Sequence, residues 1–138
     1  MLDLSAFDAE EAIQQLAQGV AHDGGVTDPA RLLADIQARE LVLPTYVGAG
    51  VALPHARTDA VSSRVLAVGR SRQGVPFGPK CELAHLIILV GCPRAEIGQY
   101  LDFCKHLMLR MHQSELRAKL MAVTEVEAFL KLLELDGE

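Results

Sequence analysis

An uninterrupted apolar run, Leu86-Ile87-Ile88-Leu89-Val90, constrains the fold of this chain more than any other feature of the sequence. A strand with one face in water alternates apolar and polar residues, whereas a strand that is covered on both faces does not need to alternate. Cys92-Pro93 follows the run, and proline cannot donate a hydrogen bond to a sheet. We therefore expect a central strand at residues 86–90 that is buried on both faces.

Helical patterns lie on both sides of this strand in the sequence. Asp8 begins a segment with an acidic first turn and apolar residues at helical spacing, and Gly24-Gly25 ends it. Asp28-Pro29 is a strong start signal for a second helix, which we expect to fade near Arg39-Glu40. Three further helices are expected after the central strand: from Ile97 to Met111, from Ser114 to Val123 and from Val126 to Leu133.

Two more strands complete the expected fold, at Gly48–Leu53 and Arg64–Gly69. The order αα-β-β-β-ααα indicates an α/β fold in which a mixed sheet has helices on both faces. A chain of 138 residues, half of them hydrophobic and 22% charged, fits a single domain over residues 1–138. The start at Met1 and the acidic end Asp136-Gly137-Glu138 are compatible with a complete small protein, but the sequence leaves open whether the chain belongs to a larger one.

Composition and charge exclude several classes of function. The formal net charge is −5 without a long basic run, which argues against nucleic-acid binding. No apolar stretch approaches the ~20 residues needed to span a bilayer, so we expect no direct membrane insertion. The first five residues lack the features of a signal peptide, and three widely spaced cysteines do not suggest a disulfide framework. The cytoplasm is the expected compartment.

The segment Pro54-His55-Ala56-Arg57 concentrates the chemistry of the chain. Proline ends the preceding strand, and this predicts that His55 lies at the exit of that strand. Residues two apart in extended backbone point the same way, so His55 and Arg57 can face one site. A ring nitrogen beside a guanidinium group suits phosphate chemistry. Taken alone the pattern carries little weight, because many such triplets are ordinary surface.

The longer segment from Gly48 to Arg57, read as GAGVALPHAR, resembles the active-site signature of the fructose/mannitol-type enzyme IIA domains of the phosphotransferase system (PTS) and of their nitrogen-regulatory relatives. Further matches in order and spacing extend the resemblance over nearly the whole chain: Arg39-Glu40, Thr45, Gly69-Arg70-Ser71, Gly74 to Gly78 and Ala84 to Val90. The resemblance implies the same architecture as the pattern of helices and strands, with short extra strands that the sequence does not place.

The function that this resemblance implies is phosphoryl transfer. His55 would accept the group from an HPr-like phosphocarrier and pass it to a IIB-type acceptor in sugar uptake, or its phosphorylation state would regulate a sugar permease or another target. A neutral ring nitrogen is nucleophilic near neutral pH, provided that an acceptor holds the other ring nitrogen and fixes the tautomer. No cofactor and no metal are expected.

Five other residues are predicted to support the phosphate on His55, and one of them, Tyr100, would do so by donating a hydrogen bond through its hydroxyl. Arg57 would offset its charge, although a solvated surface role is the alternative. Gly48 and Gly50 would let backbone N–H groups approach the phosphate closely. The hydroxyl of Thr45 would either donate to the phosphate or cap a turn. By contrast, Arg39-Glu40 is expected to be a structural pair at a helix end.

Two departures from the family pattern keep a second function open. Many members carry a second active-site histidine followed by leucine, where this chain has Tyr100-Leu101, and tyrosine cannot become an imidazolium ion. His106 is no substitute, because it lies about 240° further round the helix. Tyr46 stands where the family commonly has glycine and is expected to cover or narrow the pocket. The alternative is therefore a IIA-like regulatory binding module with weak or no phosphotransfer.

The sequence disfavours two other classes of protein, a metal-binding domain and an ATP-using kinase. Cys81 with His85, and Cys104 with His106, place soft ligands at short spacing, but no Cys-x-x-Cys or His-Glu-x-x-His motif exists. His85 is more simply a core histidine with its hydrogen bonds satisfied. An ATP-using kinase would need a Gly-x-x-x-x-Gly-Lys-Ser/Thr loop, which is absent, so any phosphoryl group must come from another protein.

Overall fold

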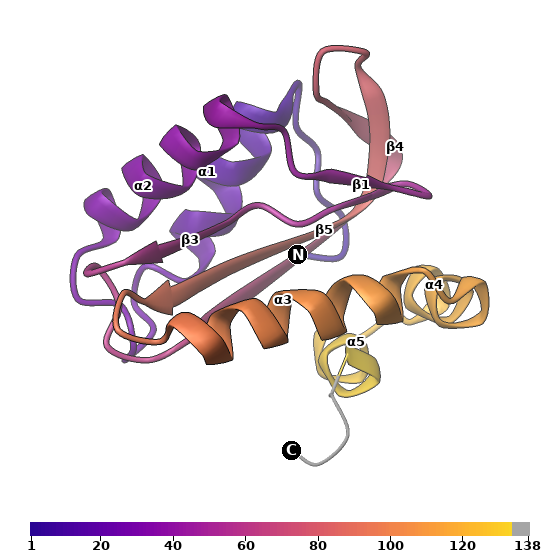
Figure 1. Cartoon of the computed structure of the whole chain (residues 1–138). Helices are drawn as coiled ribbons and strands as arrows, with labels where there is room; N and C mark the ends of the chain where they lie inside the picture. Colours follow the sequence, from indigo (N-terminus) through magenta and orange to yellow (C-terminus); the bar gives the residue numbers. More distant parts are fainter. Residues whose placement is uncertain (134–138) are drawn as a thin grey trace.

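Strand β5 (Glu82–Pro93) is the centre of the sheet in the computed structural model, which describes residues 1–133. One edge of β5 pairs in parallel with β2 (Val51–Ala52) and, further along, with β3 (His55–Thr58). The other edge pairs antiparallel with β4 (Val65–Phe77), and β1 (Tyr46–Gly48) pairs antiparallel with β2. The result is the mixed sheet that the sequence predicts (Figure 1).

Helices cover both faces of this sheet, as predicted. The first face carries α1 (Ala9–Gly19) and α2 (Pro29–Val42), and the second carries α3 (Ile97–Met111), α4 (Ser114–Ala122) and α5 (Val126–Leu133) (Figure 1). Alternate β5 side chains supply the two cores: Ile87 and Leu89 pack in the first, and Leu86, Ile88 and Val90 in the second. The run has no polar positions because each of its faces packs against helices.

The helix starts form as the sequence predicts. The Asp8 carboxylate accepts a hydrogen bond from the N–H of Glu11 at 3.0 Å, and the Glu11 carboxylate accepts one from the N–H of Phe7 at 2.6 Å. Asp28 accepts from the N–H of Arg31 at 3.1 Å, with Pro29 as the first residue of α2. These bonds satisfy N–H groups that a helix start leaves without partners.

The strand boundaries differ from the prediction, and one difference concerns the site. The nitrogen of Pro54 has no hydrogen to donate to the sheet, as predicted, but its carbonyl accepts a hydrogen bond from the N–H of Val90 at 2.9 Å. Parallel pairing with β5 therefore resumes at once, and His55 is the first residue of a new strand rather than the residue that follows one. The segment predicted at 48–53 is divided between β1 and β2, and the strands predicted at 64–69 and 86–90 run over 65–77 and 82–93.

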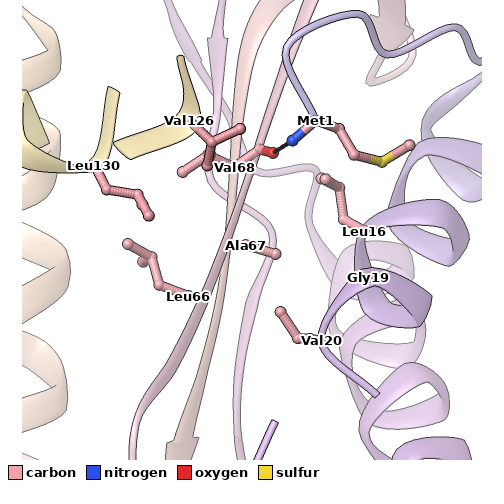
Figure 2. Close-up of a pocket in the computed structure, with 9 residues that line it drawn as sticks. All are labelled: Met1, Leu16, Gly19, Val20, Leu66, Ala67, Val68, Val126 and Leu130. Atoms are coloured by element: carbon pink, nitrogen blue, oxygen red, sulfur yellow. Dashed lines mark hydrogen bonds between the residues drawn. The ribbon is translucent and has the colours of Figure 1, made fainter. Parts of the chain in front are cut away.

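Two further features of the described residues limit the search for a site. No helix within them combines the length and apolar character that a membrane-spanning segment requires. A hollow of about 180 Å³ between α1, β4 and α5 carries no ionisable side chain, and its one charged group, the Met1 ammonium, donates to the Val68 carbonyl at 3.0 Å (Figure 2). The acidic end predicted at residues 136–138 lies outside the described residues.

Candidate functional site

His55 is held in one tautomer by the backbone next to it. Its Nδ1 lies 2.6 Å from the carbonyl oxygen of Leu53. A carbonyl oxygen can only accept, so Nδ1 carries the hydrogen and Nε2 keeps a free lone pair. The acceptor that the sequence analysis required for a nucleophilic histidine is therefore Leu53.

The surroundings of His55 favour its neutral form. Burial of the ring lowers the pKa of His55 below its ordinary value, and the positive charge of Arg39 acts in the same direction. The hydrogen bond to Leu53 and the charge of Glu40 oppose this shift but do not reverse it. Near neutral pH the ring is thus uncharged, and Nε2 is available as a nucleophile.

His55 and Arg57 lie on one face of β3, as predicted. Both are half-buried, whereas Ala56 and Thr58 between and after them are buried on the opposite face. The hydroxyl of Thr58 donates to the carboxylate of Asp35 at 2.6 Å, which ties β3 to α2. The position of the His55 face therefore depends on a contact between segments 23 residues apart.

A basic hollow of about 410 Å³ lies beside this strand. Three arginines line this hollow: Arg39, Arg57 and Arg94. Tyr100 also lines it, and Asp35 contributes the only carboxylate among its lining residues. Arg57 Nη1 donates to the carbonyl of Arg94 at 3.2 Å, and Arg94 forms an exposed salt bridge with Asp59 at 3.4 Å. A hollow with this excess of guanidinium groups suits an anion, and phosphate above all.

Arg39 and Arg94 are residues that sequence reasoning missed. The structural role expected for Arg39-Glu40 at a helix end is found for both side chains, since each forms a hydrogen bond just beyond the end of α2. Within residues 1–133 no salt bridge joins the two. Arg39 instead donates to the carbonyl of Leu43 at 2.8 Å and lines the hollow. The resemblance around Arg39-Glu40 was a usable signal for the first residue, whereas no sequence signal pointed to Arg94.

Thr45 is buried and bonded to Glu40. The hydroxyl of Thr45 donates to one Glu40 carboxylate oxygen at 2.6 Å, and its backbone N–H donates to the other at 2.9 Å. Its carbonyl accepts from the N–H of Leu53 at 3.0 Å, and Leu53 in turn holds His55. This geometry favours the turn-capping alternative, because the single hydroxyl hydrogen is already donated. Phosphate contact by Thr45 stays a prediction.

Gly48 and Gly50 lie in the turn between β1 and β2, away from His55. Both have positive φ angles, 96° and 77°, which glycine adopts without strain. The N–H of Gly50 donates to the hydroxyl of Tyr46 at 2.9 Å, so Tyr46 covers this turn rather than the His55 site. The turn meets β5 beside His85, whereas His55 pairs with Val90 at the other end of the strand (Figure 1). The structure does not bring these glycines to His55, and their phosphate-binding role stays a prediction.

Tyr100 does meet His55. The two ring centroids are 5.7 Å apart and the rings are tilted by 52°. Burial, followed by the nearby Cys104 thiol, raises the pKa of Tyr100 to about 12, so its hydroxyl keeps its hydrogen at any physiological pH. Tyr100 therefore offers a neutral hydrogen-bond donor beside the nucleophile. His106, six residues further along α3, is exposed.

The cysteines and histidines at short spacing belong to no larger cluster of metal-ligating side chains in the part of the chain that the structure describes. Within residues 1–133, no three side chains of histidine, cysteine, aspartate or glutamate gather around one point. Burial raises the pKa of Cys92 to about 11 and also raises that of Cys104, which disfavours the thiolate that a metal needs. His85 donates from Nδ1 to the carbonyl of Ser71 at 2.9 Å, as expected, but it is half-buried rather than in the core, and within the described residues its Nε2 has no hydrogen bond.

Comparison with known proteins extends over nearly the whole chain. The family model described as "Phosphoenolpyruvate-dependent sugar phosphotransferase system, EIIA 2" matches residues 1–135. A curated relative from Escherichia coli (strain K12), the PTS system 2-O-alpha-mannosyl-D-glycerate-specific EIIABC component, is 30% identical over 133 residues. The match covers 93% of this chain and 20% of that relative, so the chain spans a fifth of the relative's length.

Two solved structures have the same architecture. Nitrogen regulatory protein IIA-Ntr from Neisseria meningitidis is 25% identical with a TM-score of 0.86, over 96% of this chain and 91% of that one. The complex of enzyme IIAMTL and phosphorylated enzyme IIBMTL from Escherichia coli contains a chain that is 25% identical with a TM-score of 0.81. That match covers 96% of this chain and 92% of the other.

Proposed function

The chain belongs to the EIIA 2 family of the phosphoenolpyruvate-dependent sugar phosphotransferase system, and from this premise we propose that His55 Nε2 accepts a phosphoryl group from an HPr-like phosphocarrier. The group then passes to a IIB-type acceptor in sugar uptake, or the phosphorylation state of His55 regulates a permease or another target. We place residues 1–138 in one EIIA type-2 domain that works in the cytoplasm. The observation that carries the proposal is the hydrogen bond from Nδ1 to Leu53, which leaves Nε2 free.

The transfer needs no proton to leave His55. The Nε2 lone pair forms a bond to phosphorus, the bond between phosphorus and the donor's ring nitrogen breaks, and its electron pair returns to that nitrogen. The product on His55 carries phosphorus on Nε2 and hydrogen on Nδ1, so the ring bears a positive charge. The Leu53 carbonyl stabilises this charge through the same 2.6 Å hydrogen bond.

The arginines and Tyr100 would stabilise the negative charge on the transferred phosphoryl group. Transfer of this kind is catalysed mainly by positioning and by stabilising charge on the phosphoryl oxygens. Arg57 shares the His55 face of β3, and Arg39 is close enough for its charge to lower the pKa of His55. Tyr100 adds a neutral donor beside the ring and lines the same hollow as the arginines.

The docking surface for the protein partners lies around His55. Leu41 and Val42, which end α2 just after Arg39, are 87% and 81% exposed. On α3, Ile97 and Leu101 flank Tyr100 in sequence and are 56% and 60% exposed. An exposed apolar surface around a reactive histidine suits a protein donor and acceptor. The similar structure with a phosphorylated IIB protein supports a IIB-type partner.

A regulatory binding module is the second candidate function. Tyr100 is the observation that favours it, because a tyrosine whose pKa is about 12 supplies no positive charge to the phosphate. In this version the surface around His55 recognises a target protein, and phosphotransfer is weak or absent.

Intact-mass spectrometry separates the two functions. The chain is incubated with phosphoenolpyruvate, enzyme I and an HPr from the same organism, and the expected result is an acid-labile mass gain of one phosphate. His55→Ala should abolish this gain, while His85→Gln should keep it. No gain in the native chain, with an HPr that phosphorylates another IIA protein in parallel, would favour the regulatory module.

A further inference from the structure

A second basic hollow lies at the opposite end of β5 from His55, and the proposed function does not use it. Its volume is about 350 Å³, and its walls are the turn between β1 and β2, the irregular stretch of β4 between Arg70 and Val75, the start of β5 and helix α4. His55 pairs with Val90, whereas His85 lies five residues earlier in the same strand. At about 3.3 Å per residue, the two positions are about 16 Å apart along β5. This is the end of the sheet near α4 in Figure 1, away from the start of α3.

All side chains with polar atoms that line this hollow are cationic or basic. They are Arg72 at the end of the regular part of β4, His85 in β5 and Arg117 in α4, and no carboxylate lines the hollow. Arg117 uses one guanidinium nitrogen, Nη1, to donate to the carbonyl of Met111 at 2.7 Å and keeps its other N–H groups. Arg72 is exposed, and its side chain forms no hydrogen bond or salt bridge within residues 1–133.

The imidazole ring of His85 lies against two glycines, Gly50 and Gly74, where a larger residue would crowd it. Nδ1 donates to the Ser71 carbonyl at 2.9 Å, so Nε2 has no hydrogen of its own in the neutral ring. A Cβ at Gly50 would lie 3.3 Å from His85 Cδ2, and one at Gly74 would lie 3.0 Å from Cε1 and 3.4 Å from Nε2. Both glycines have positive φ angles, 77° and 87°, so other residues would strain there as well as crowd the ring.

The chemistry of these three side chains selects one class of ligand. Two guanidinium groups from separate elements suit the oxygens of a dianion. A bare Nε2 can accept a hydrogen from the O–H group of the inorganic phosphate dianion, which a carboxylate lacks, whereas a protonated ring would donate to the dianion of a phosphomonoester. We propose that the hollow formed by Arg72, His85 and Arg117 is a binding site for inorganic phosphate or a small phosphomonoester.

Nuclear magnetic resonance of the histidine side chains tests this site directly. Inorganic phosphate and glycerol 3-phosphate are titrated separately into the full chain, with sodium chloride keeping the ionic strength constant. The expected result is a saturable shift of the His85 Nε2 resonance with at least one of the two probes, and the tighter probe identifies the source of the phosphate group. No saturable shift of His85 with either probe overturns the proposal.

Two substitutions decide whether a shift comes from this hollow. Arg72→Gln removes a charged donor from an exposed side chain and should raise the dissociation constant about fivefold or more. Ala118→Glu places a carboxylate at an exposed position of α4 that lines the hollow and should abolish saturable binding. Both positions are on the surface, so amide spectra should confirm that the fold is unchanged.

The matched control lies at the other basic hollow. Arg57→Gln removes an arginine beside His55 and should leave the His85 shift and its dissociation constant unchanged. If Arg57→Gln abolishes the shift, or if Arg72→Gln and Ala118→Glu both leave it intact, phosphate binds elsewhere and the proposal is wrong. Neither result bears on phosphoryl transfer to His55, which the mass measurement tests separately.

Discussion

The two ends of β5 use the same local chemistry and differ in what surrounds it. At each end a histidine donates from Nδ1 to a backbone carbonyl, Leu53 for His55 and Ser71 for His85, and so keeps Nε2 free. At each end arginines from separate elements line a hollow. Around His55 lie a tyrosine ring and exposed apolar side chains, whereas the walls at His85 are a glycine turn and the side of α4.

This comparison teaches that a free ring nitrogen beside arginines is not enough to define a phosphoryl acceptor. A protein donor must approach closely, which requires an exposed surface that it can cover, and we propose that the end of α2 and the start of α3 provide this surface at His55. At His85 the same groups are suited to a small anion. Four experiments can test this distinction between the two ends of β5.

The largest effect is expected for Arg57→Gln. Loss of a charged donor from the His55 face should lower the rate of phosphoryl transfer about tenfold to hundredfold. Single-turnover transfer from phosphorylated HPr, followed by quenched-flow mass spectrometry, measures the rate. Arg72→Gln is the matched control and should leave the rate unchanged, so equal losses in both variants would remove the distinction between the two ends.

Tyr100→Phe should have a smaller effect on the same rate. If the hydroxyl donates to the transferred group, its loss should slow transfer about threefold to tenfold. With a pKa of about 12, Tyr100 keeps its hydrogen over the whole working range, so it should add no pH dependence to the native rate. Tyr100→His should restore donation and introduce a dependence on pH. An unchanged rate in Tyr100→Phe would show that the ring only packs against His55.

Thr45→Val tests the support of the His55 end. The variant keeps the shape of the side chain but leaves a Glu40 oxygen without its 2.6 Å hydrogen bond, and should lower the free energy of unfolding by about 1–2 kcal/mol. Urea unfolding measures this loss. Tyr46→Phe is the comparison at the other end, because it removes the acceptor for the N–H of Gly50. Only Thr45→Val should also slow transfer. Residue 45 is held less firmly without its bond to Glu40, and its carbonyl binds the N–H of Leu53, which in turn orients His55.

The smallest effect concerns the pH dependence of stability. The pKa of His55 is lowered in the folded chain, mainly by burial, so the unfolded chain binds more protons in the window just below the ordinary value of 6.5. Stability that is present above this window is therefore lost as the pH falls through it. The free energy of unfolding should fall more from pH 7.5 to pH 5.5 in the native chain than in His55→Asn.

A control for that measurement lies above the window. Between pH 8 and pH 9 the two chains should change in parallel, because His55 is neutral in both the folded and the unfolded state. Equal slopes below pH 6.5 would mean that the ring is not desolvated on folding.

Features that depend on neighbouring residues were predictable from the sequence. Asp8 and Asp28 cap the helices that follow them, because a carboxylate reaches N–H groups only three residues away. The unbroken apolar run predicted a central strand, and period-two geometry predicted that His55 and Arg57 share a face. Tyr100 came from the resemblance to a family rather than from spacing, and the structure places it against His55.

Features that depend on distant segments were not predictable in this way. Strand β3 forms because Pro54, which cannot donate, still offers its carbonyl to Val90. Arg94 reaches the basic hollow through a contact with Arg57 across 37 positions of sequence. Gly50, which the signature places just before His55, lies beside His85 instead, because β2 and β3 pair with different stretches of β5.

The mixed α/β fold, the helix starts and the prediction of His55 as the phosphoryl acceptor all came from the sequence, since each rests on periodicity, on contacts within a few residues or on a continuous motif. Tertiary structure alone decided which groups surround each histidine. Parallel pairing with β5 carries β2 and β3 to separate positions along one strand, so residues that are close in the chain face different hollows. The arginines of α2, β4 and α4 reach those hollows only when their helices and strands pack on the sheet.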